Sequence, residues 1–348
     1  MQILKRHRRL TAVLVGCIAV GLGTLAFAQN QRYPASPVGI EITARPIAAF
    51  DNRDVSRVRF GALEFRGGLV MTSAAPAFGG ISGFHLDADG GRFVAVTDRG
   101  AWLRGRIVYR DGAPDAIADA EMAPILGADG KPLAARGWYD VESLTELDGQ
   151  FYAGIERVHR IVRLDYRKRG LAAQGEPIPV PADFKTLASN KGLECLAGGR
   201  KGSALAGTLV AVAEESLDAQ GRHRGFLLKG GKTARFAVTQ SDAFAITDCA
   251  FLPSGDLLLL ERHFSAVRGA AMRVRRLPAA AIRPDAVVDG DVLIVADLAY
   301  QIDNMEGIAV HRNDRGEIIL TIVSDNNFSF IQRNLLLQFA LIEDGRGK

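Results

Sequence analysis

The chain repeats one short pattern five times, at a spacing of 52 to 60 residues. Each copy has an apolar frame, a third position that is mostly acidic, and a small residue in the fourth position. The copies read GISGF (80–84), DVESL (140–144), GLECL (192–196), ITDCA (246–250) and NMEGI (304–308). Their third residues are Ser82, Glu142, Glu194, Asp248 and Glu306. A period of this length is typical of a β-propeller, in which each repeat forms one blade.

A second frame follows each first frame by 13 to 20 residues, and it carries an acid without exception. The five copies read AVTDRG, AGIERV, AVAEES, LLLERH and IVSDNN, and their acids are Asp98, Glu156, Glu214, Glu261 and Asp325. Acids inside β-like stretches are unfavourable unless something pairs them, so a recurring acid calls for a partner.

Short β-like runs fill each repeat and are separated by turn signals such as Asp148-Gly149 and Ser254-Gly255. This pattern predicts an all-β fold. We count five repeats and expect five or six blades. The segment 58–72 lacks both frames and reads as outer-strand material. It is expected to complete the blade formed by 333–344, so that N- and C-terminal strands close the ring.

The first 28 residues read as an export signal: four basic residues precede an uncharged apolar run that ends in Ala26-Phe27-Ala28. We expect residues 1–28 to be removed, and residues 29–348 to form a single propeller domain without a membrane span. A Sec-type signal would place the protein in the periplasm or outside the cell. A twin-arginine route through Arg8-Arg9, a lipoprotein cut at Cys17 and a retained anchor are the alternatives.

The charge balance gives no reason to expect nucleic-acid binding. The whole chain has 43 basic and 39 acidic residues, and loss of the signal leaves 39 of each. No basic cluster is interleaved with aromatic residues. The remaining cysteines, Cys195 and Cys249, fit the small position near the propeller axis and are interpreted as packing residues. One bridge between them is allowed in an oxidising compartment, but the spacing does not decide it.

The frames bring acids together. The first frame begins the inner strand of a blade and the second ends the adjacent antiparallel strand, so both lie at the same edge. Five such edges form one rim that carries nine carboxylates. Like charges at this density require bound cations, basic partners or protonation. Oxygen ligands favour Ca²⁺, with another divalent cation as the alternative. The expected ligands are Glu142, Glu194, Glu306, Asp325, Asp98 and Glu261, with amide oxygens from Asn190, Asn304, Asn326 and Asn327.

Glu156 or Glu214 is the expected general base, and His159 is a further candidate for acid–base catalysis on the same rim. A structural alternative is equally open for the second-frame acids. An arginine directly follows the acid in three repeats, at Arg99, Arg157 and Arg262, and such pairs could join neighbouring blades.

Several stretches resemble the phytase-like propeller family, known as "esterase-like activity of phytase". They are FGALEFRGGLVMT, FGGISGFHLDADGGRFVAVTDRGAWL, GWYDVESLTELDGQFYAGIERVHRIVRL, NMEGIAVHR and VSDNNFSFIQRNLLLQFAL, and they span 60–341. The resemblance implies an exported bacterial propeller that hydrolyses phosphate or carboxylate esters. Characterised β-propeller phytases carry an Asp-Asp-Pro-Ala stretch, whereas this chain has SAAPAFGG at 73–80. The acid-rich rim is also similar to that of calcium-dependent propeller lactonases and esterases.

These observations predict a Ca²⁺-dependent ester hydrolase that acts on a small-molecule substrate. The alternative is a non-catalytic propeller of the cell envelope that binds a ligand or another protein. The oligomeric state does not follow from the sequence.

Overall fold

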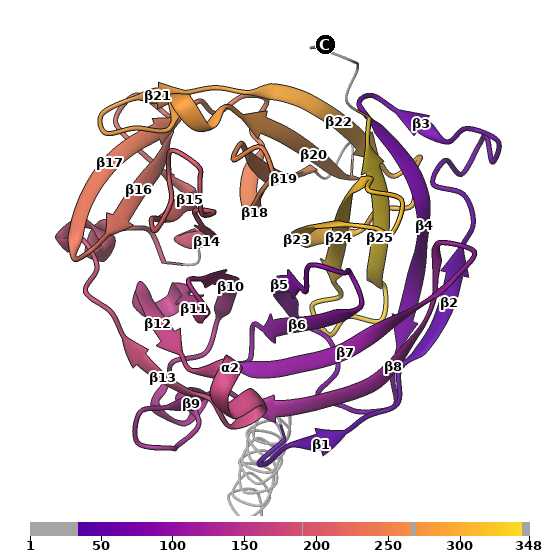
Figure 1. The fold of residues 1–348 in the computed structure, drawn as a ribbon, viewed down its shortest axis with the longest axis horizontal. Coiled ribbons are helices and arrows are strands. Elements are labelled where there is room, and N and C mark those ends of the chain that lie inside the picture. Colours follow the sequence, from indigo (N-terminus) through magenta and orange to yellow (C-terminus); the bar gives the residue numbers. More distant parts are fainter. Residues whose placement is uncertain (1–33, 190, 266–268, 343–348) are drawn as a thin grey trace, which may run out of the picture.

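The computed structural model describes residues 34–189, 191–265 and 269–342. The expected signal at 1–28 and Asn190 lie outside these residues. Within them, no helix is long and apolar enough to cross a membrane. The strands form five sheets arranged as blades around a common axis, as Figure 1 shows, so the predicted all-β propeller is confirmed and no sixth blade is found in the described part of the chain.

The inner strands of the five blades follow chain order. Blade 1 contains β5 (Ile81–Leu86), β6 (Arg92–Thr97), β7 (Ala101–Arg110), β8 (Ala113–Pro124) and β1 (Val38–Gly39). Blade 2 contains β10 (Val141–Leu147), β11 (Gln150–Ile155), β12 (Arg160–Leu164), β13 (Gln174–Pro177) and β9 (Leu126–Gly127). Blade 3 contains β14 (Leu193–Gly198), β15 (Leu209–Leu217), β16 (His223–Lys229), β17 (Lys232–Val238) and β21 (Val287–Val288).

Blade 4 contains β18 (Ala245–Phe251), β19 (Leu257–Ser265), β20 (Gly269–Leu277) and β22 (Asp291–Asp297). Blade 5 contains β23 (Asn304–Arg312), β24 (Ile318–Asp325), β25 (Asn334–Leu341), β4 (Leu63–Thr72) and β2 (Thr43–Ile47), with β3 (Arg59–Phe60) paired to β4. The short helices are η1 (Leu133–Arg136), η2 (Glu156–Val158), α2 (Tyr166–Arg169), η3 (Gly170–Ala172), η4 (Ala182–Thr186) and η5 (Ala279–Ala281).

Blade 5 joins the two ends of the described chain. N-terminal β4 pairs antiparallel with C-terminal β25, from Met71 opposite Asn334 to Leu63 opposite Leu341. The expectation that 58–72 completes the C-terminal blade is therefore correct. The five inner strands β5, β10, β14, β18 and β23 contact one another in order around the axis, and β23 also contacts β5.

The apolar core is divided among the spaces between blades. One cluster of buried side chains lies between each pair of neighbours; for example, Trp102 of blade 1 packs with Phe151 of blade 2. This arrangement follows from the alternation of strand residues, because each face of a blade must be covered by the next blade. The core therefore holds neighbouring inner strands in fixed positions.

A disulfide joins two of these inner strands. Cys195 of β14 and Cys249 of β18 are bonded, with their Cα atoms 5.1 Å apart. Both residues are buried in the cluster between blades 3 and 4. The sequence left this bridge open, and the structure adds a covalent link to the packing role that was expected for both cysteines.

Candidate functional site

Three glutamates of the first frame are the extra residues of β-bulges. In blade 2, Val141 pairs with Ile155 and Ser143 pairs with Gly154, which leaves Glu142 without a partner in the ladder. The same irregularity falls at Glu194 in blade 3 and at Glu306 in blade 5. A bulge re-aims a side chain at the start of a strand. Its repetition directs three carboxylates toward one end of the propeller axis.

The second-frame acids lie at the same end. In four blades the acid directly follows the residue that pairs with the last inner-strand residue before the bulge. The acids in this position are Asp98, Glu156, Glu214 and Asp325. Together with the three bulge glutamates they make seven of the nine carboxylates predicted for the rim. We call this end of the axis the acidic mouth.

Blade 4 is shifted by one residue relative to the other blades. Ile246 pairs with Glu261 and Asp248 pairs with Leu260, so the extra residue is Thr247. Thr247 thus takes the place of the bulge glutamates, and Arg262 takes the place of the second-frame acids. Because successive strand residues face opposite sides, a shift of one residue exchanges which side chain reaches the axis.

The shift removes Glu261 from the acidic mouth. Its side chain is fully buried and accepts hydrogen bonds from Arg273 Nε at 2.6 Å and from Arg275 Nη2 at 2.6 Å. We therefore correct the prediction of Glu261 as a metal ligand: it is held by two arginines inside blade 4. The carboxylate of Asp248 also has a partner inside the fold: its Oδ2 accepts a hydrogen bond from the backbone N–H of Ile308 at 2.8 Å.

Three glutamates at the acidic mouth come close enough to share an ion. Glu156, Glu194 and Glu214 are all buried, and each offers a carboxylate oxygen within 4.8 Å of the other two. Glu156 Oε1 also accepts a hydrogen bond from the backbone of Gly192 at 2.6 Å, which fixes its orientation. Glu156 and Glu214 were expected to be bases, but this geometry groups them with Glu194 as candidate metal ligands.

Arg262 is a cation that contacts two acids of the acidic mouth. Its guanidinium lies 3.0 Å from Glu214 Oε1 and 2.8 Å from Glu306 Oε1. It also donates to Asn304 Oδ1 at 2.5 Å, and Asn304 donates to Glu306 at 2.7 Å. Arg262 therefore links an acid of blade 3 to an acid of blade 5 across blade 4.

The other two arginines of the acid–arginine pattern take part in contacts with aromatic rings. Arg99 lies over the ring of Phe328 at 3.2 Å, and Arg157 lies over Tyr139 at 4.6 Å. Both contribute charge at the mouth: burial raises the pKa values of Asp98 and Asp140, and the charges of Arg99 and Arg157 offset part of that rise. Of the three arginines that follow a second-frame acid, Arg262 forms salt bridges to rim acids of two neighbouring blades.

The crowding changes the proton affinity of the carboxylates. Burial, reinforced by neighbouring negative charges, raises the pKa of Glu306 to about 8 and those of Asp98 and Glu156 to about 7. Burial also raises the pKa values of Glu142 and Glu194 well above the ordinary range. Desolvation is the largest cause in each case. Without a cation, the acidic mouth therefore retains protons at neutral pH.

Some oxygens at the mouth have no protein partner. Asp98 Oδ1 and Glu306 Oε2 are buried and make no hydrogen bond within the described chain. A buried carboxylate oxygen without a donor is costly unless a proton or a cation satisfies it. Buried oxygen donors of this kind, with the glutamate trio beside them, fit a hard divalent cation.

Where blades 5 and 1 meet, the loops at the mouth leave no space for a side chain at two glycines. A Cβ on Gly80 would stand 2.2 Å from Asp98 Oδ1, and one on Gly79 would stand 2.5 Å from Asn326 Oδ1. Asp325 Oδ1 accepts a hydrogen bond from the backbone of Asn327. Burial raises the pKa of Asp325 to about 6. The two glycines thus allow the backbone to approach Asp98 and Asn326 closely.

His159 lies beside the trio. It is the C-terminal cap of η2, directly after Val158. A Cβ placed on Gly192 would stand 3.1 Å from the His159 Nδ1 atom. Burial lowers its pKa, so the imidazole is neutral at pH 7, and Nδ1 makes no hydrogen bond. His159 has a left-handed backbone with φ 48°, and Asp140 and Asn327 at the same mouth do too, at 68° and 47°. Such strain is concentrated at functional sites in many proteins.

Sequence reasoning missed the site role of two residues, Asp140 and Arg262. Asp140 is the first residue of the first frame of blade 2, and its charge acts on Asp98, Glu142 and Glu156. Asn304 is the corresponding residue of blade 5. An alignment of the repeats could have pointed to this position. Arg262 was expected only as a structural partner of the acids. The letters LLLERH align with the other second frames as if blade 4 were not shifted by one residue, and this alignment places Glu261 at the mouth instead of Arg262.

Comparison with known proteins agrees with the repeats. Residues 76–328 match the phytase-like family, described as "Esterase-like activity of phytase". No curated protein matches. Among solved structures, the chain is similar to an endo-arabinase from Bacteroides thetaiotaomicron VPI-5482, with 13% identity over 77% of this chain and 96% of that chain and a TM-score of 0.44. It is also similar to a glutaminyl cyclase from Myxococcus xanthus, with 12% identity over 76% and 92% and a TM-score of 0.41.

The structure titled Dos1 propeller has 11% identity over 82% of this chain and 76% of that chain, with a TM-score of 0.35. The match to the family covers most of the chain and includes four of the five blades with the acids of the mouth that they carry. The chain therefore belongs to the phytase-like family, whose description is "Esterase-like activity of phytase".

Proposed function

We propose that this protein is an exported hydrolase of phosphate or carboxylate esters that binds Ca²⁺ at the acidic mouth. The observation that carries the proposal is the trio Glu156, Glu194 and Glu214, whose oxygens lie within 4.8 Å of one another. Family membership supports the reaction class. The disulfide between Cys195 and Cys249 supports an oxidising compartment, in agreement with the signal expected at 1–28.

The ligand set favours Ca²⁺ over softer metals because it consists of carboxylate oxygens. Glu156, Glu194 and Glu214 would hold the ion, and Glu142 and Glu306 would stand beside it as further acids or as proton carriers. A bound Ca²⁺ would polarise the ester oxygen and favour ionisation of a water molecule. Another divalent cation with oxygen preference, such as Mn²⁺, is the alternative.

The chain's own residues would orient the substrate and move protons. Arg262 presents a guanidinium at the mouth and can bind the anionic oxygens of a phosphate or a developing carboxylate. His159 is neutral and its Nδ1 has no partner, so it can accept a proton from water. Asp98, with a pKa raised to about 7, can exchange a proton at neutral pH.

The test uses residues 29–348 freed of metal with EDTA and returned to millimolar Ca²⁺, with p-nitrophenyl phosphate and p-nitrophenyl acetate as substrates. We expect Ca²⁺ to raise the melting temperature and to restore hydrolysis of at least one ester. Glu194→Gln should lose both effects. Glu215→Gln is the matched control, because Glu215 is adjacent to the trio but pairs with Lys191.

An absence of stabilisation by Ca²⁺, Mg²⁺ and Mn²⁺ would contradict the metal site. Binding of Ca²⁺ without hydrolysis of either ester would favour the second candidate, a non-catalytic ligand-binding propeller of the envelope. That candidate draws support from Arg262, which already offsets part of the negative charge of Glu214 and Glu306.

A further inference from the structure

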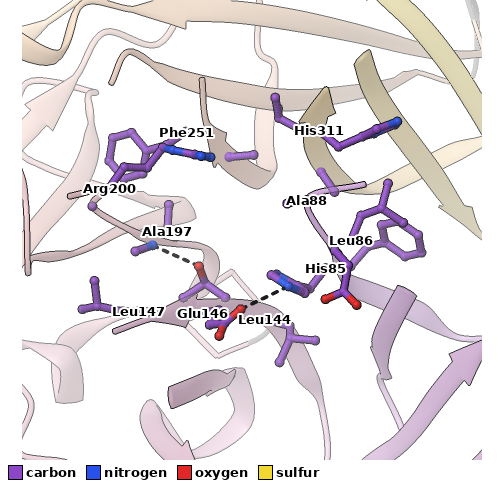
Figure 2. Close-up of a pocket in the computed structure, with 18 of the residues that line it drawn as sticks. His85, Leu86, Ala88, Leu144, Glu146, Leu147, Ala197, Arg200, Phe251 and His311 are labelled. Carbon is purple, nitrogen blue, oxygen red and sulfur yellow. Dashed lines mark hydrogen bonds and ion pairs between the residues drawn. The ribbon is translucent and has the colours of Figure 1, made fainter. Parts of the chain in front are cut away.

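The far end of the propeller axis holds a cavity. The inner strands contain six to nine residues, which corresponds to about 20–30 Å at 3.3 Å per residue. Their first residues form the acidic mouth, and their last residues and the following segments line a cavity of about 590 Å³. Figure 2 shows this cavity with residues from all five blades around it, among them His85, Glu146, Arg200, Phe251 and His311. We call it the distal cavity.

Part of the charge in the distal cavity is already neutralised. Arg167 donates to both oxygens of Glu146, at 2.9 and 2.6 Å, and to Asp87 at 3.3 Å. His85 Nε2 lies 3.4 Å from the same carboxylate of Glu146, and the two side chains face each other in Figure 2. This group of one arginine, two carboxylates and a histidine leaves no positive charge for a ligand.

Three other cations on the lining have no carboxylate partner in the described chain. Arg200 and Lys201 follow β14 and are exposed, and Arg312 at the end of β23 donates only to the backbone oxygen of Gly316. The unpaired acid on the same lining is Asp148, which is exposed. The distal cavity therefore has a surplus of positive charge, in contrast to the acidic mouth at the other end of the axis.

Polar and apolar atoms share the lining of the cavity, and we call its apolar part the floor. It contains Phe84, Leu144, Phe251 and Ile308 from four different inner strands. His311 is buried, and burial lowers its pKa to about 4, so it adds no charge at neutral pH. The volume lies within the range of about 300–1,000 Å³ that is usual for sites of small molecules.

We propose that the distal cavity binds a small molecule with an apolar body and one anionic group, either a carboxylate or a phosphate. The apolar body would occupy the floor near Phe251 and Ile308. The anionic group would lie toward Arg200 and Lys201, where charge-assisted hydrogen bonds are available. The site is separate from the acidic mouth and does not depend on the hydrolase activity.

Isothermal titration of the EDTA-treated protein with phenyl phosphate, benzoate and inorganic phosphate tests the proposal. We expect one saturable site for phenyl phosphate or for benzoate, and the one that binds identifies the anionic group. Inorganic phosphate should bind at least about tenfold more weakly than phenyl phosphate, because it lacks the apolar body. Equal binding of the two phosphates would overturn the role of the floor.

The variant Arg200→Ala/Lys201→Ala should weaken binding of the aromatic anion at least about tenfold. The matched control is Lys229→Ala/Lys232→Ala, which removes two exposed lysines from the β16–β17 hairpin of the same blade. The control should bind as the native protein does. An absence of saturable binding by either aromatic anion, or an equal effect of the two double variants, would overturn the proposal.

Discussion

Glu261 and Arg262 are adjacent in β19, but they serve different parts of the molecule. Glu261 is buried between Arg273 and Arg275 inside blade 4, whereas Arg262 reaches the acidic mouth and contacts acids of two other blades. Their exchange follows from the position of one bulge residue, Thr247. The account therefore assigns a structural role to Glu261 and a site role to Arg262.

Glu261→Gln should destabilise the fold and leave Ca²⁺ binding intact. The substitution leaves Arg273 and Arg275 buried without their shared carboxylate, and breaking a buried ion pair of this kind costs about 3–5 kcal/mol. Urea unfolding measures the loss, and a Ca²⁺ titration of the folded variant measures the site. A variant with native stability and no Ca²⁺ binding would show that the shift in blade 4 is assigned wrongly.

Arg262→Met should strengthen Ca²⁺ binding and weaken the metal-free fold. Loss of the guanidinium removes a resident cation that competes with the ion for Glu214 and Glu306. Without Ca²⁺ the lost charged hydrogen bonds should cost about 2 kcal/mol of unfolding free energy at pH 8. Arg262→Lys keeps the charge. Its Ca²⁺ affinity and its metal-free stability should therefore lie between those of the native protein and those of Arg262→Met. Unchanged Ca²⁺ affinity in Arg262→Met would contradict the counter-ion role.

Sequence reasoning found seven of the carboxylates at the mouth but not their grouping. The letters of the second frame place Glu261 with Asp98 and Glu156, because a sequence pattern does not reveal where a bulge falls. The bulge decides which side chain faces the axis. The choice of Glu156 and Glu214 as bases likewise could not anticipate that Glu194 comes within ligand distance of both.

The inner strands are the elements on which the site depends. Each begins at the acidic mouth and ends at the distal cavity, so one set of five strands positions both. β14 supplies Glu194 near its start and Cys195 next to it, and Cys195 is bonded to Cys249 of β18. The disulfide thus ties the strand that carries a candidate ligand to the blade that carries Arg262.

Replacing both cysteines, Cys195→Ala with Cys249→Ala, should lower the unfolding free energy by about 2–5 kcal/mol. The bridge spans a sequence separation of 54 residues, and both sulfurs are buried, so the effect combines chain entropy with lost packing. Urea unfolding of the double variant, beside the native protein with and without reductant, measures it. Native stability in the double variant would contradict the stabilising role of the bridge.

The elements themselves were predictable to a large extent. Turn signals and the repeat period identified an inner strand and its neighbour in each blade. The pairing of 58–72 with the C-terminal strand followed from the missing frames, and β4 pairs with β25 as expected. The disulfide was not decided, because strands 54 residues apart meet only when two blades are packed side by side.

At the scale of the whole molecule, the propeller gathers like charges at one end of its axis. The core between blades fixes the inner strands, and the fixed strands hold the carboxylates together against their repulsion. Burial and neighbouring acids raise the pKa values of Glu306, Asp98 and Glu156 above their unfolded values. The folded protein without metal therefore binds more protons than the unfolded chain.

Stability of the metal-free protein should fall as the pH rises from 6.5 to 8.5. Folded carboxyl groups with pKa values of about 7 to 8 lose their protons in this window, whereas the same groups are ionised throughout in the unfolded chain. The expected fall is about 3 kcal/mol. Millimolar Ca²⁺ should reverse the trend, because it replaces the protons. Urea unfolding at several pH values, in EDTA and in Ca²⁺, measures how stability depends on pH with and without the ion. The same dependence in EDTA and in Ca²⁺ would contradict the prediction.

The measurement that tests the central claim most directly is a calorimetric titration of Ca²⁺ into the metal-free protein at pH 7, in two buffers of different ionisation enthalpy. The account predicts saturable binding with release of about one proton or more per ion, since the ligands are partly protonated beforehand. Glu194→Gln should abolish both, and Glu215→Gln should preserve them. An absence of binding in the native protein, or native binding in Glu194→Gln, would contradict the assignment of the acidic mouth as a metal site.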